Sequence, residues 1–393
     1  MNKIIISVSI FLSCLNLSGQ TFEDFIDKVK LSHPEIIAAR TLLSSDEALS
    51  KTGNTPDDPR INMGYFPGND AAPGDKITWG ISQSFDFPGM YSRIKTLKES
   101  KLELAKMEYS LACVYIMSEA RSAAIEYLSL LETLEIQQER METMNRLEKA
   151  YSILLDKGEA SIIDYNKIRI KQVEYISELT STSNRLDILK TRLDYMSGDN
   201  SEDLLNSDYP LISEPALPVL LEGLRSVHPA FLLPDLRTQA ARNEIRVSKA
   251  GNMPSFDIGF SSEIVADETF TGPSLGLSLP LWKNKGQVNK SLAVAEYQSK
   301  KAESEKLYQE SVYMAYYRSY QSNKENLAIV EDALENSDNR KLIDKTLDKR
   351  EISLREYLIE LGSIYELVDI YQALKKEKYI LLSKLNELDF SDL

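Results

Sequence analysis

The chain has 393 residues, of which 42% are apolar and 27% charged, so it is too hydrophobic for a disordered protein and too polar for a helical membrane protein. Its net charge of -14 argues against a nucleic-acid partner, because this balance offers few cations to displace counterions from phosphates. With two Cys and two His, a disulfide framework is excluded and little material remains for a histidine-based metal or catalytic site.

The N-terminal segment 1–19 has the pattern of a secretory signal peptide. Lys3 precedes an apolar run from Ile4 to Leu12, and small residues follow. The run is too short to span a bilayer, and we expect cleavage after Gly19. An alternative interpretation makes Cys14 a lipid-carrying N-terminus, and both interpretations predict export from the cytoplasm. Cys113 then remains as a lone thiol, which we expect to be a small buried apolar residue.

The rest of the chain consists of two similar halves, 20–198 and 214–393, joined by an acidic linker at 199–213. Several short motifs recur in the same order at nearly constant offsets, which indicates a tandem duplication. The recurring motifs are His-Pro at His33 and His228, GN-x-P at Gly53 and Gly251, and the phrases "LLDKGEASIIDY" from Leu154 and "TLDKREISLREY" from Thr346. The last two share Leu, Asp, Lys, Glu, Ser and Tyr at matching positions.

Each half predicts the same series of elements: a helical segment, two short strands and two very long helices. In the first half these are a helix from 22 to 51, strands at about 60–67 and 77–87, and helices at about 89–157 and 159–197. In the second they are a helix from 217 to 249, strands at about 254–264 and 273–282, and helices at about 286–348 and 351–390. Since Pro is tolerated in a first helical turn, we interpret His33 and His228 as helix-start residues rather than ligands.

The long helices are unusual for a compact domain. The 68 residues from Met90 to Lys157 contain no Gly or Pro, which corresponds to a rod of about 100 Å. Apolar residues recur among charges along it, as in an amphipathic helix that packs against partners.

The strands alternate between an apolar and a small polar face. In "ITWGISQSFDF" (77–87) and "SLGLSLPLW" (274–282), every second residue is mostly large and apolar, and those between are mainly Ser, Thr or Gly. This period of two is typical of a strand between lipid and an aqueous lumen. The alternative is a soluble two-sheet core, which gives the same alternation. Four strands cannot close a barrel, and open edges are not tolerated in lipid, whereas twelve strands from three copies would close.

With these features the chain resembles the TolC-like outer-membrane efflux protein family. The resemblance covers nearly all of the mature chain and rests on the duplicated unit, on "FDFPG" (85–89) at a strand-to-helix junction and on "KGEASIIDY" (157–165) at a helix-to-helix turn. It implies a mainly α fold with a small β-barrel part, in which duplicated long-helix hairpins form a trimeric tunnel in the periplasm. Four strands per chain would contribute to a shared 12-stranded barrel in the outer membrane of a Gram-negative bacterium.

The same resemblance implies a function and partners. The chain would be the exit duct of a tripartite efflux system, passing small molecules or metal ions from an inner-membrane pump and a periplasmic adaptor protein to the exterior. The repeated phrases would then be the hairpin tips that contact the adaptor. By resemblance these tips are Gly158, Glu159, Ala160 and Ser161 in the first half and Arg350, Glu351, Ile352 and Ser353 in the second. Arg350 stands where the family's turn glycine is expected, which leaves the geometry of the second turn open.

A pore constriction is expected just inside these tips. Asp164 and Glu356 occupy matching positions, and three copies would bring six carboxylates towards one axis, favouring cations. Lys157, Lys349 and Arg355 are candidate partners that would hold the mouth shut. The alternative is that these acids are ordinary solvated residues of a helix surface.

No catalytic site, metal site or cofactor is predicted, because no nucleophile–His–carboxylate trio, phosphate-binding glycine loop or zinc-ligand spacing is present in the sequence. A second hypothesis is a secreted coiled-coil structural or interaction protein without a pore. It explains the long helices and the charge but gives the alternating strands no cause. The exported substrate and the type of pump do not follow from the sequence.

Overall fold

The computed structural model describes residues 22–68, 74–198, 207–265, 268–282, 284–337 and 339–390. The predicted signal peptide, with Cys14 and Gly19, lies outside these ranges, as does most of the predicted linker. The first half contains α1 (Phe22–Ser32), α2 (Pro34–Ser50), β1 (Arg60–Phe66), β2 (Lys76–Phe85), α3 (Met90–Asp156) and α4 (Ile162–Ser197). The second contains α5 (Leu217–Val227), α6 (Pro229–Ala250), β3 (Ser255–Val265), β4 (Glu268–Ser278), α7 (Gln287–Ser337), α8 (Arg340–Asp348), α9 (Leu354–Leu385) and a short 3-10 helix, η2 (Glu387–Phe390).

These elements form two compact units, and each unit contains segments of both sequence halves. The hairpin unit consists of the described residues within 1–33, 119–212 and 324–380. The strand unit consists of those within 34–118, 213–323 and 381–393. Because α3 and α7 are so long, each runs from the strand unit into the hairpin unit.

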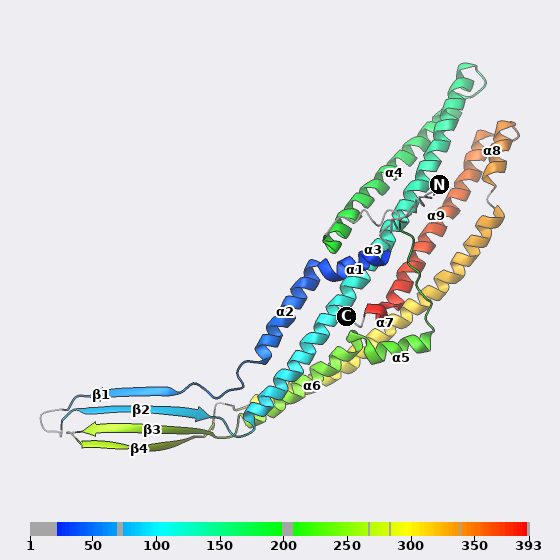
Figure 1. Ribbon diagram of the computed structural model, residues 1–393. Helices are drawn as coiled ribbons and strands as arrows, with labels where there is room; N and C mark the ends of the chain where they lie inside the picture. Colours follow the sequence, from blue (N-terminus) through cyan, green and yellow to red (C-terminus); the bar gives the residue numbers. More distant parts are fainter. Residues whose placement is uncertain are drawn as a thin grey trace, which may run out of the picture. The chain divides into compact units, whose positions relative to one another are not determined.

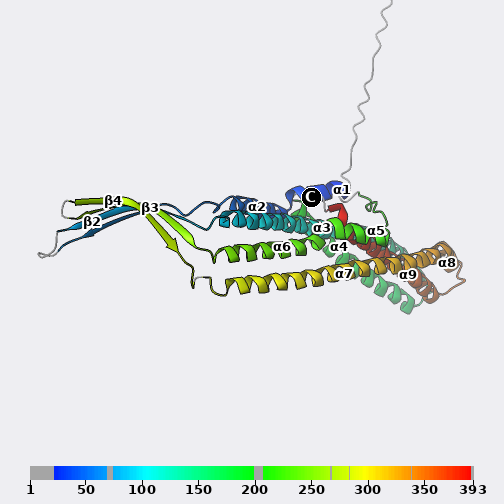
Figure 2. The ribbon, with the colours of Figure 1, turned by 90° about the horizontal axis from the view of Figure 1, so that it is seen from below.

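The strand unit contains one four-stranded sheet in the order β1-β2-β3-β4, with every neighbouring pair antiparallel. Helices α2 and α6 of the same unit precede β1 and β3 in sequence and lie beyond one end of the strands, not over a face of the sheet (Figures 1 and 2). Among the described residues, β1 and β4 each pair on one side only and are therefore the edges of the sheet.

The hairpin unit is held together by a core close to its two helix-to-helix turns. Buried side chains of α3, α4 and α9 form this core, with partly buried residues of α8 packed against it. The buried members are Met144, Ile168, Leu354, Tyr357, Leu361 and Tyr365. Burying such side chains contributes about 1.5–3 kcal/mol each, which favours the antiparallel pairing of the long helices.

Several elements differ from their predicted form. The first helical segment is two helices separated at His33, because Pro34 lacks the amide that would continue the helical bonding. The predicted helix 286–348 ends at Ser337 and resumes at Arg340 as α8. His228 does begin a helix: it is the N-cap of α6, and its Nδ1 accepts a hydrogen bond from the amide of Ala230 (3.2 Å).

The predicted range of the fourth strand, 273–282, was wrong. β4 spans 268–278, because Pro280 cannot donate to the ladder and because the residues from Glu268 onward, which do not follow the apolar alternation strictly, pair with β3. Pro273 is accommodated since β4 is an edge strand. Cys113 is buried, as predicted. No helix in the described ranges combines the length and the apolar character needed to cross a bilayer.

Candidate functional site: an exposed apolar sheet face and two hairpin tips

The register of the sheet brings the apolar alternation of all four strands to one face. Residues directly opposite each other in an antiparallel pair point to the same side, and Ile81 lies opposite both Ile61 and Phe260. Large apolar side chains therefore line this face, and they are between 39% and 83% exposed. This apolar face comprises Ile61, Met63, Tyr65, Ile77, Trp79, Ile81, Phe256, Ile258, Phe260, Leu275 and Leu277.

The opposite face of the sheet carries mostly small and polar residues, with Phe66 and Phe270 as the large apolar exceptions. Asn62 lies opposite Gly80, and Gly80 lies opposite Ser261. A contiguous exposed apolar surface of this size is rare on soluble proteins, and it marks a protein or membrane contact. The soluble two-sheet core would require these side chains to be buried, whereas in this chain they are exposed.

The first hairpin tip joins α3 to α4. Gly158 has a φ of 71°, its amide donates to the carbonyl of Leu155 (2.9 Å), and the amide of Glu159 donates to the carbonyl of Leu154 (2.8 Å). These two bonds form a Schellman motif, in which a residue in the left-handed conformation terminates the helix and turns the chain. A glycine favours this conformation because it has no Cβ.

The second tip has the same geometry without the glycine. Arg350 has a φ of 60°, its amide donates to the carbonyl of Leu347 (2.9 Å), and the amide of Glu351 donates to the carbonyl of Thr346 (2.9 Å). Among the described residues Arg350 is the one non-glycine with a positive φ. The question left open by the sequence is therefore answered: the second chain reversal is a Schellman motif with an arginine in the strained position.

The two tips are joined by an ion pair. Nη2 of Arg350 lies 2.7 Å from Oε2 of Glu159, and the two side chains are 72% and 46% exposed. The hydrogen bond from Arg350 holds the pKa of Glu159 below its ordinary value. The position that departs from the repeat thus supplies a contact between the hairpins that a glycine would lack.

Each tip is followed by a capped helix start, but the two caps differ. Ser161 Oγ accepts a hydrogen bond from the amide of Ile163 (3.1 Å). At the second tip, Ser353 Oγ accepts from the amide of Glu356 (3.2 Å), while the Glu356 carboxylate accepts from the amide of Ser353 (2.8 Å). This reciprocal arrangement is a capping box, and its S-x-x-E pattern could have been identified from the sequence.

Within one chain the constriction acids make other contacts besides the predicted ones, and the charge of Arg355 does act on Glu356. Lys167 pairs with Asp164, with 3.2 Å between Nζ and Oδ1, and Glu356 is engaged by Ser353. Hydrogen bonds from Ser353 lower the pKa of Glu356. Arg355 is exposed and lines a groove between α4 and α9.

The other predicted tip residues are less uniform than the repeat suggests. Ala160 is partly buried, and Ile352 packs against the core of the hairpin unit. Glu351 is exposed and lies 3.8 Å from Lys349. Ile352 is therefore a packing residue at the base of the tip, and the exposed tip surface is polar.

The tyrosine that ends each repeated phrase positions the tip, a role that the sequence analysis did not identify. Tyr165 Oη donates to Glu148 of α3 (2.6 Å), and Tyr357 Oη donates to Asp344 of α8 (2.8 Å). In each hairpin a hydrogen bond therefore connects the helix after the tip to the helix before it. The recurrence of Tyr in both repeated phrases was the available signal in the sequence. The hydrogen-bond acceptors, Glu148 and Asp344, do not occupy corresponding positions in the two halves, so the repeat did not identify them.

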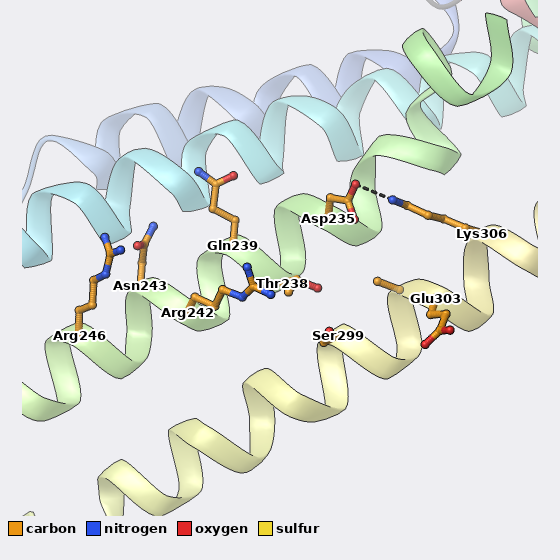
Figure 3. Close-up of a pocket in the computed structure, with 10 residues that line it drawn as sticks. Asp235, Thr238, Gln239, Arg242, Asn243, Arg246, Ser299, Glu303 and Lys306 are labelled. Atoms are coloured by element: carbon orange, nitrogen blue, oxygen red, sulfur yellow. Dashed lines mark hydrogen bonds and ion pairs between the residues drawn. The ribbon is translucent and has the colours of Figure 1, made fainter. Parts of the chain in front are cut away.

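A polar groove of 760 Å³ lies in the strand unit between α6 and α7. In Figure 3 Asp235 of α6 reaches Lys306 of α7, and the two side chains are 2.5 Å apart. Arg242 and Arg246 follow on α6. The lining is almost entirely polar, as expected for a surface in contact with water.

Comparison with known proteins places this fold. No protein-family model and no curated protein sequence matches the chain. Among solved structures, the outer-membrane channel OprN is 14% identical, with a TM-score of 0.80 over 93% of this chain and 89% of that one. The MtrE outer-membrane channel of Neisseria gonorrhoeae is 12% identical, with a TM-score of 0.77 over 94% of this chain and 88% of that one. The CmeC outer-membrane channel of Campylobacter jejuni is 12% identical, with a TM-score of 0.73 over 98% of this chain and 93% of that one.

At these identities the likeness is one of fold. The prediction of a mainly helical chain with long helices and four antiparallel strands is confirmed. Over more than nine-tenths of its length, this chain has the same fold as the outer-membrane channels OprN, CmeC and MtrE.

Proposed function

We propose that three copies of this chain form the outer-membrane exit duct of a tripartite efflux system, without enzymatic activity of their own. The duct would pass small molecules or metal ions from an inner-membrane pump, through a periplasmic adaptor protein, to the exterior. The observation that carries the proposal is a sheet with one exposed apolar face, whose edge strands β1 and β4 each lack a second partner strand in the described part of the chain. The shared fold with outer-membrane channels supports it.

The step from sheet to trimer is physical. In lipid every backbone amide and carbonyl needs a partner, so a sheet with open edges can exist there only if the edges pair. Pairing β1 of one copy with β4 of the next satisfies both edges at once. Three copies then give a 12-stranded barrel with its apolar face towards lipid and its small polar face towards water.

The hairpin tips are the proposed contact with the adaptor. Their exposed polar surface, which includes Glu159, Arg350 and Glu351, suits a contact that forms and releases in water. Asp164, Glu356 and Arg355 follow the tips by less than two helical turns, and we propose that they form the constriction of the duct.

A pair of neighbouring residues tests the membrane contact. Met63 is 83% exposed on the apolar face, and Asn62, the next residue, lies on the opposite face. Met63→Arg should destabilise the membrane-inserted protein by about 2–4 kcal/mol, because the charge would enter hydrocarbon. Asn62→Arg, the matched control, should be tolerated in a water-filled lumen. Membrane fractionation and the yield of heat-resistant trimer measure the difference, and equal effects of the two variants would contradict the lipid contact.

Cross-linking tests the assembly. We expect Asn62→Cys on β1, combined in separate variants with Gly272→Cys, Ser274→Cys or Gly276→Cys on the same face of β4, to give covalent dimers and trimers in outer membranes under mild oxidation for at least one of the three pairs. The native Cys113 is buried and provides little background. A monomer recovered from the periplasm in buffer without detergent would instead favour the secreted structural protein.

Planar-bilayer conductance tests the constriction. Glu356→Gln is the informative variant, because glutamine maintains a capping box and the substitution removes only the charge. We expect Asp164→Asn with Glu356→Gln to reduce cation selectivity, and Arg355→Gln to raise it. Unchanged selectivity in all variants would remove these residues from the pore while leaving the membrane proposal intact.

A further inference from the structure

A cavity of 450 Å³ lies within the hairpin unit, where α7 has ended and α8 begins. Side chains of α3, α8 and α9 form most of its wall, and Leu334 of α7 completes it. Its volume is within the range of sites that bind small organic molecules. We call it the α8 cavity. All of its lining residues belong to one compact unit.

One part of the wall is apolar. Ile136 comes from α3, Leu334 from α7, and Leu361 and Val368 from α9, two helical turns apart. Tyr371 adds an aromatic ring. Such a wall favours a flat apolar ligand of about the size of a bicyclic ring, because the side chains on both sides would lose contact with water.

The floor contains a buried arginine. Arg140 is 4% exposed, forms two hydrogen bonds with the carboxylate of Asp369 (2.6 and 3.0 Å), and lies 4.6 Å above the ring of Tyr365. Its Nε is buried and has no hydrogen-bond partner, and the same holds for Oε1 of Gln372, which also lines the cavity. Buried polar atoms of this kind are usually satisfied, so the cavity holds unused hydrogen-bonding capacity.

Basic side chains outnumber acidic ones in the lining, although the protein as a whole carries a net charge of -14: Arg140, Arg146, Arg340 and Lys341 stand against Glu139 and Asp344. Arg146 donates to the hydroxyl of Thr143, a neutral partner (3.1 Å), and Lys341 has no ion-pair partner among the residues that the structure describes. Of the lining acids, Asp344 accepts a hydrogen bond from the hydroxyl of Tyr357, and Glu139 is exposed, as Arg146 and Lys341 are. The N-terminus of α8, where Asn339 makes no side-chain cap, adds its partial positive charge.

We propose that the α8 cavity binds a small aromatic carboxylate, with the ring against the apolar wall and the carboxylate towards Arg140, Arg146 and Lys341. An apolar wall facing a group of cations selects an amphipathic anion over a neutral ring or an aromatic cation. The ligand needs both an aromatic ring, which the apolar wall would bury, and a carboxylate, which the cations would bind. An inorganic anion or a hydrocarbon alone would therefore bind more weakly. The site does not depend on the proposed channel function, because it lies within a single chain.

Isothermal titration of the full-length protein with 2-naphthoate, in a neutral detergent, tests the proposal. We expect saturable binding below about 1 mM, and at least about tenfold weaker binding of 2-naphthol and 2-naphthylmethylammonium. The same titrations into detergent alone remove the contribution of partitioning. Absence of saturable 2-naphthoate binding, or equal binding of the three compounds, would overturn the proposal.

Two variants locate the binding. Val368→Trp should fill the cavity, and Arg146→Ala with Lys341→Ala should remove the unpaired cations, each lowering the affinity for 2-naphthoate about tenfold or more. Lys149→Ala with Lys345→Ala is the matched control: it removes the same charge from exposed positions of α3 and α8 outside the cavity. If this control loses as much affinity as Arg146→Ala with Lys341→Ala, the effect is a non-specific electrostatic attraction by surface charge, and the proposed site is refuted. Should Val368→Trp fail to fold, the charge variant and its control decide alone.

Discussion

Exchanging the two tip residues, by Gly158→Arg and Arg350→Gly, separates backbone strain from side-chain contact. Both positions have left-handed backbone, with φ of 71° and 60°, and both end a helix in a Schellman motif. A Cβ on Gly158 would meet no atom within 4 Å, so a side chain there adds strain and no clash. Gly158→Arg therefore adds the free-energy cost of holding a residue with a Cβ in the left-handed conformation, and Arg350→Gly removes nearly the same cost.

The magnitudes follow from that symmetry. A left-handed non-glycine residue costs about 1–2 kcal/mol, and part of this is offset because glycine makes the unfolded chain more flexible. We expect Gly158→Arg to weaken the first tip by about 1 kcal/mol. Arg350→Gly should gain a similar amount at the second tip, reduced by the loss of its exposed ion pair with Glu159. In a Glu159→Gln background that loss is absent, so the full gain should appear.

Native-state hydrogen exchange measures these effects locally. The amides of Glu159 and Glu351 each donate the outer hydrogen bond of their Schellman motif, to Leu154 and Thr346. Their exchange rates therefore report opening of the tip. We expect about fivefold faster exchange at Glu159 in Gly158→Arg and about fivefold slower exchange at Glu351 in Arg350→Gly with Glu159→Gln. If Gly158→Arg leaves exchange unchanged, or if Arg350→Gly accelerates it in the Glu159→Gln background, left-handed strain is not what limits the tips.

Three further outcomes are expected. Glu356→Ala should speed amide exchange in the first turn of α9 several-fold, because alanine breaks the capping box with Ser353. Glu356→Gln should leave the exchange rate unchanged, because glutamine can maintain the box. Equal exchange rates in the two variants would argue against the capping box. Burial lowers the pKa of His228, so its contribution to stability is present above about pH 6.5 and is lost as the pH falls from there towards the folded-state pKa. Thermal unfolding should therefore depend less on pH below about 6.5 in His228→Asn, which maintains an N-cap, and an unchanged pH profile would count against this linkage. Asp369→Ala should destabilise the hairpin unit by about 1–2 kcal/mol, because the buried Arg140 loses a carboxylate that is itself 56% exposed and partly screened by water. Asp369→Asn should cost less, and a thermal melt with no shift in either variant would contradict the argument.

The sequence by itself determined the architecture because architecture follows from periodic patterns. The long stretches without Gly or Pro predict long helices, and the alternation in 77–87 predicts which side chains share a face, whatever their neighbours are. The repeated phrases placed both chain reversals, since a turn is a local feature of a few residues. These predictions depend on interactions within one segment.

Tertiary structure decided what depends on residues distant in the sequence. The sequence left the geometry of the second turn open at Arg350, and the fold holds this residue in the left-handed conformation and pairs it with Glu159 of the other hairpin. The acceptors of Tyr165 and Tyr357 occupy unmatched positions on the preceding helices, so the repeat did not reveal them. The extent of β4 was set by its pairing with β3, because backbone hydrogen bonds form whether or not the side chains alternate.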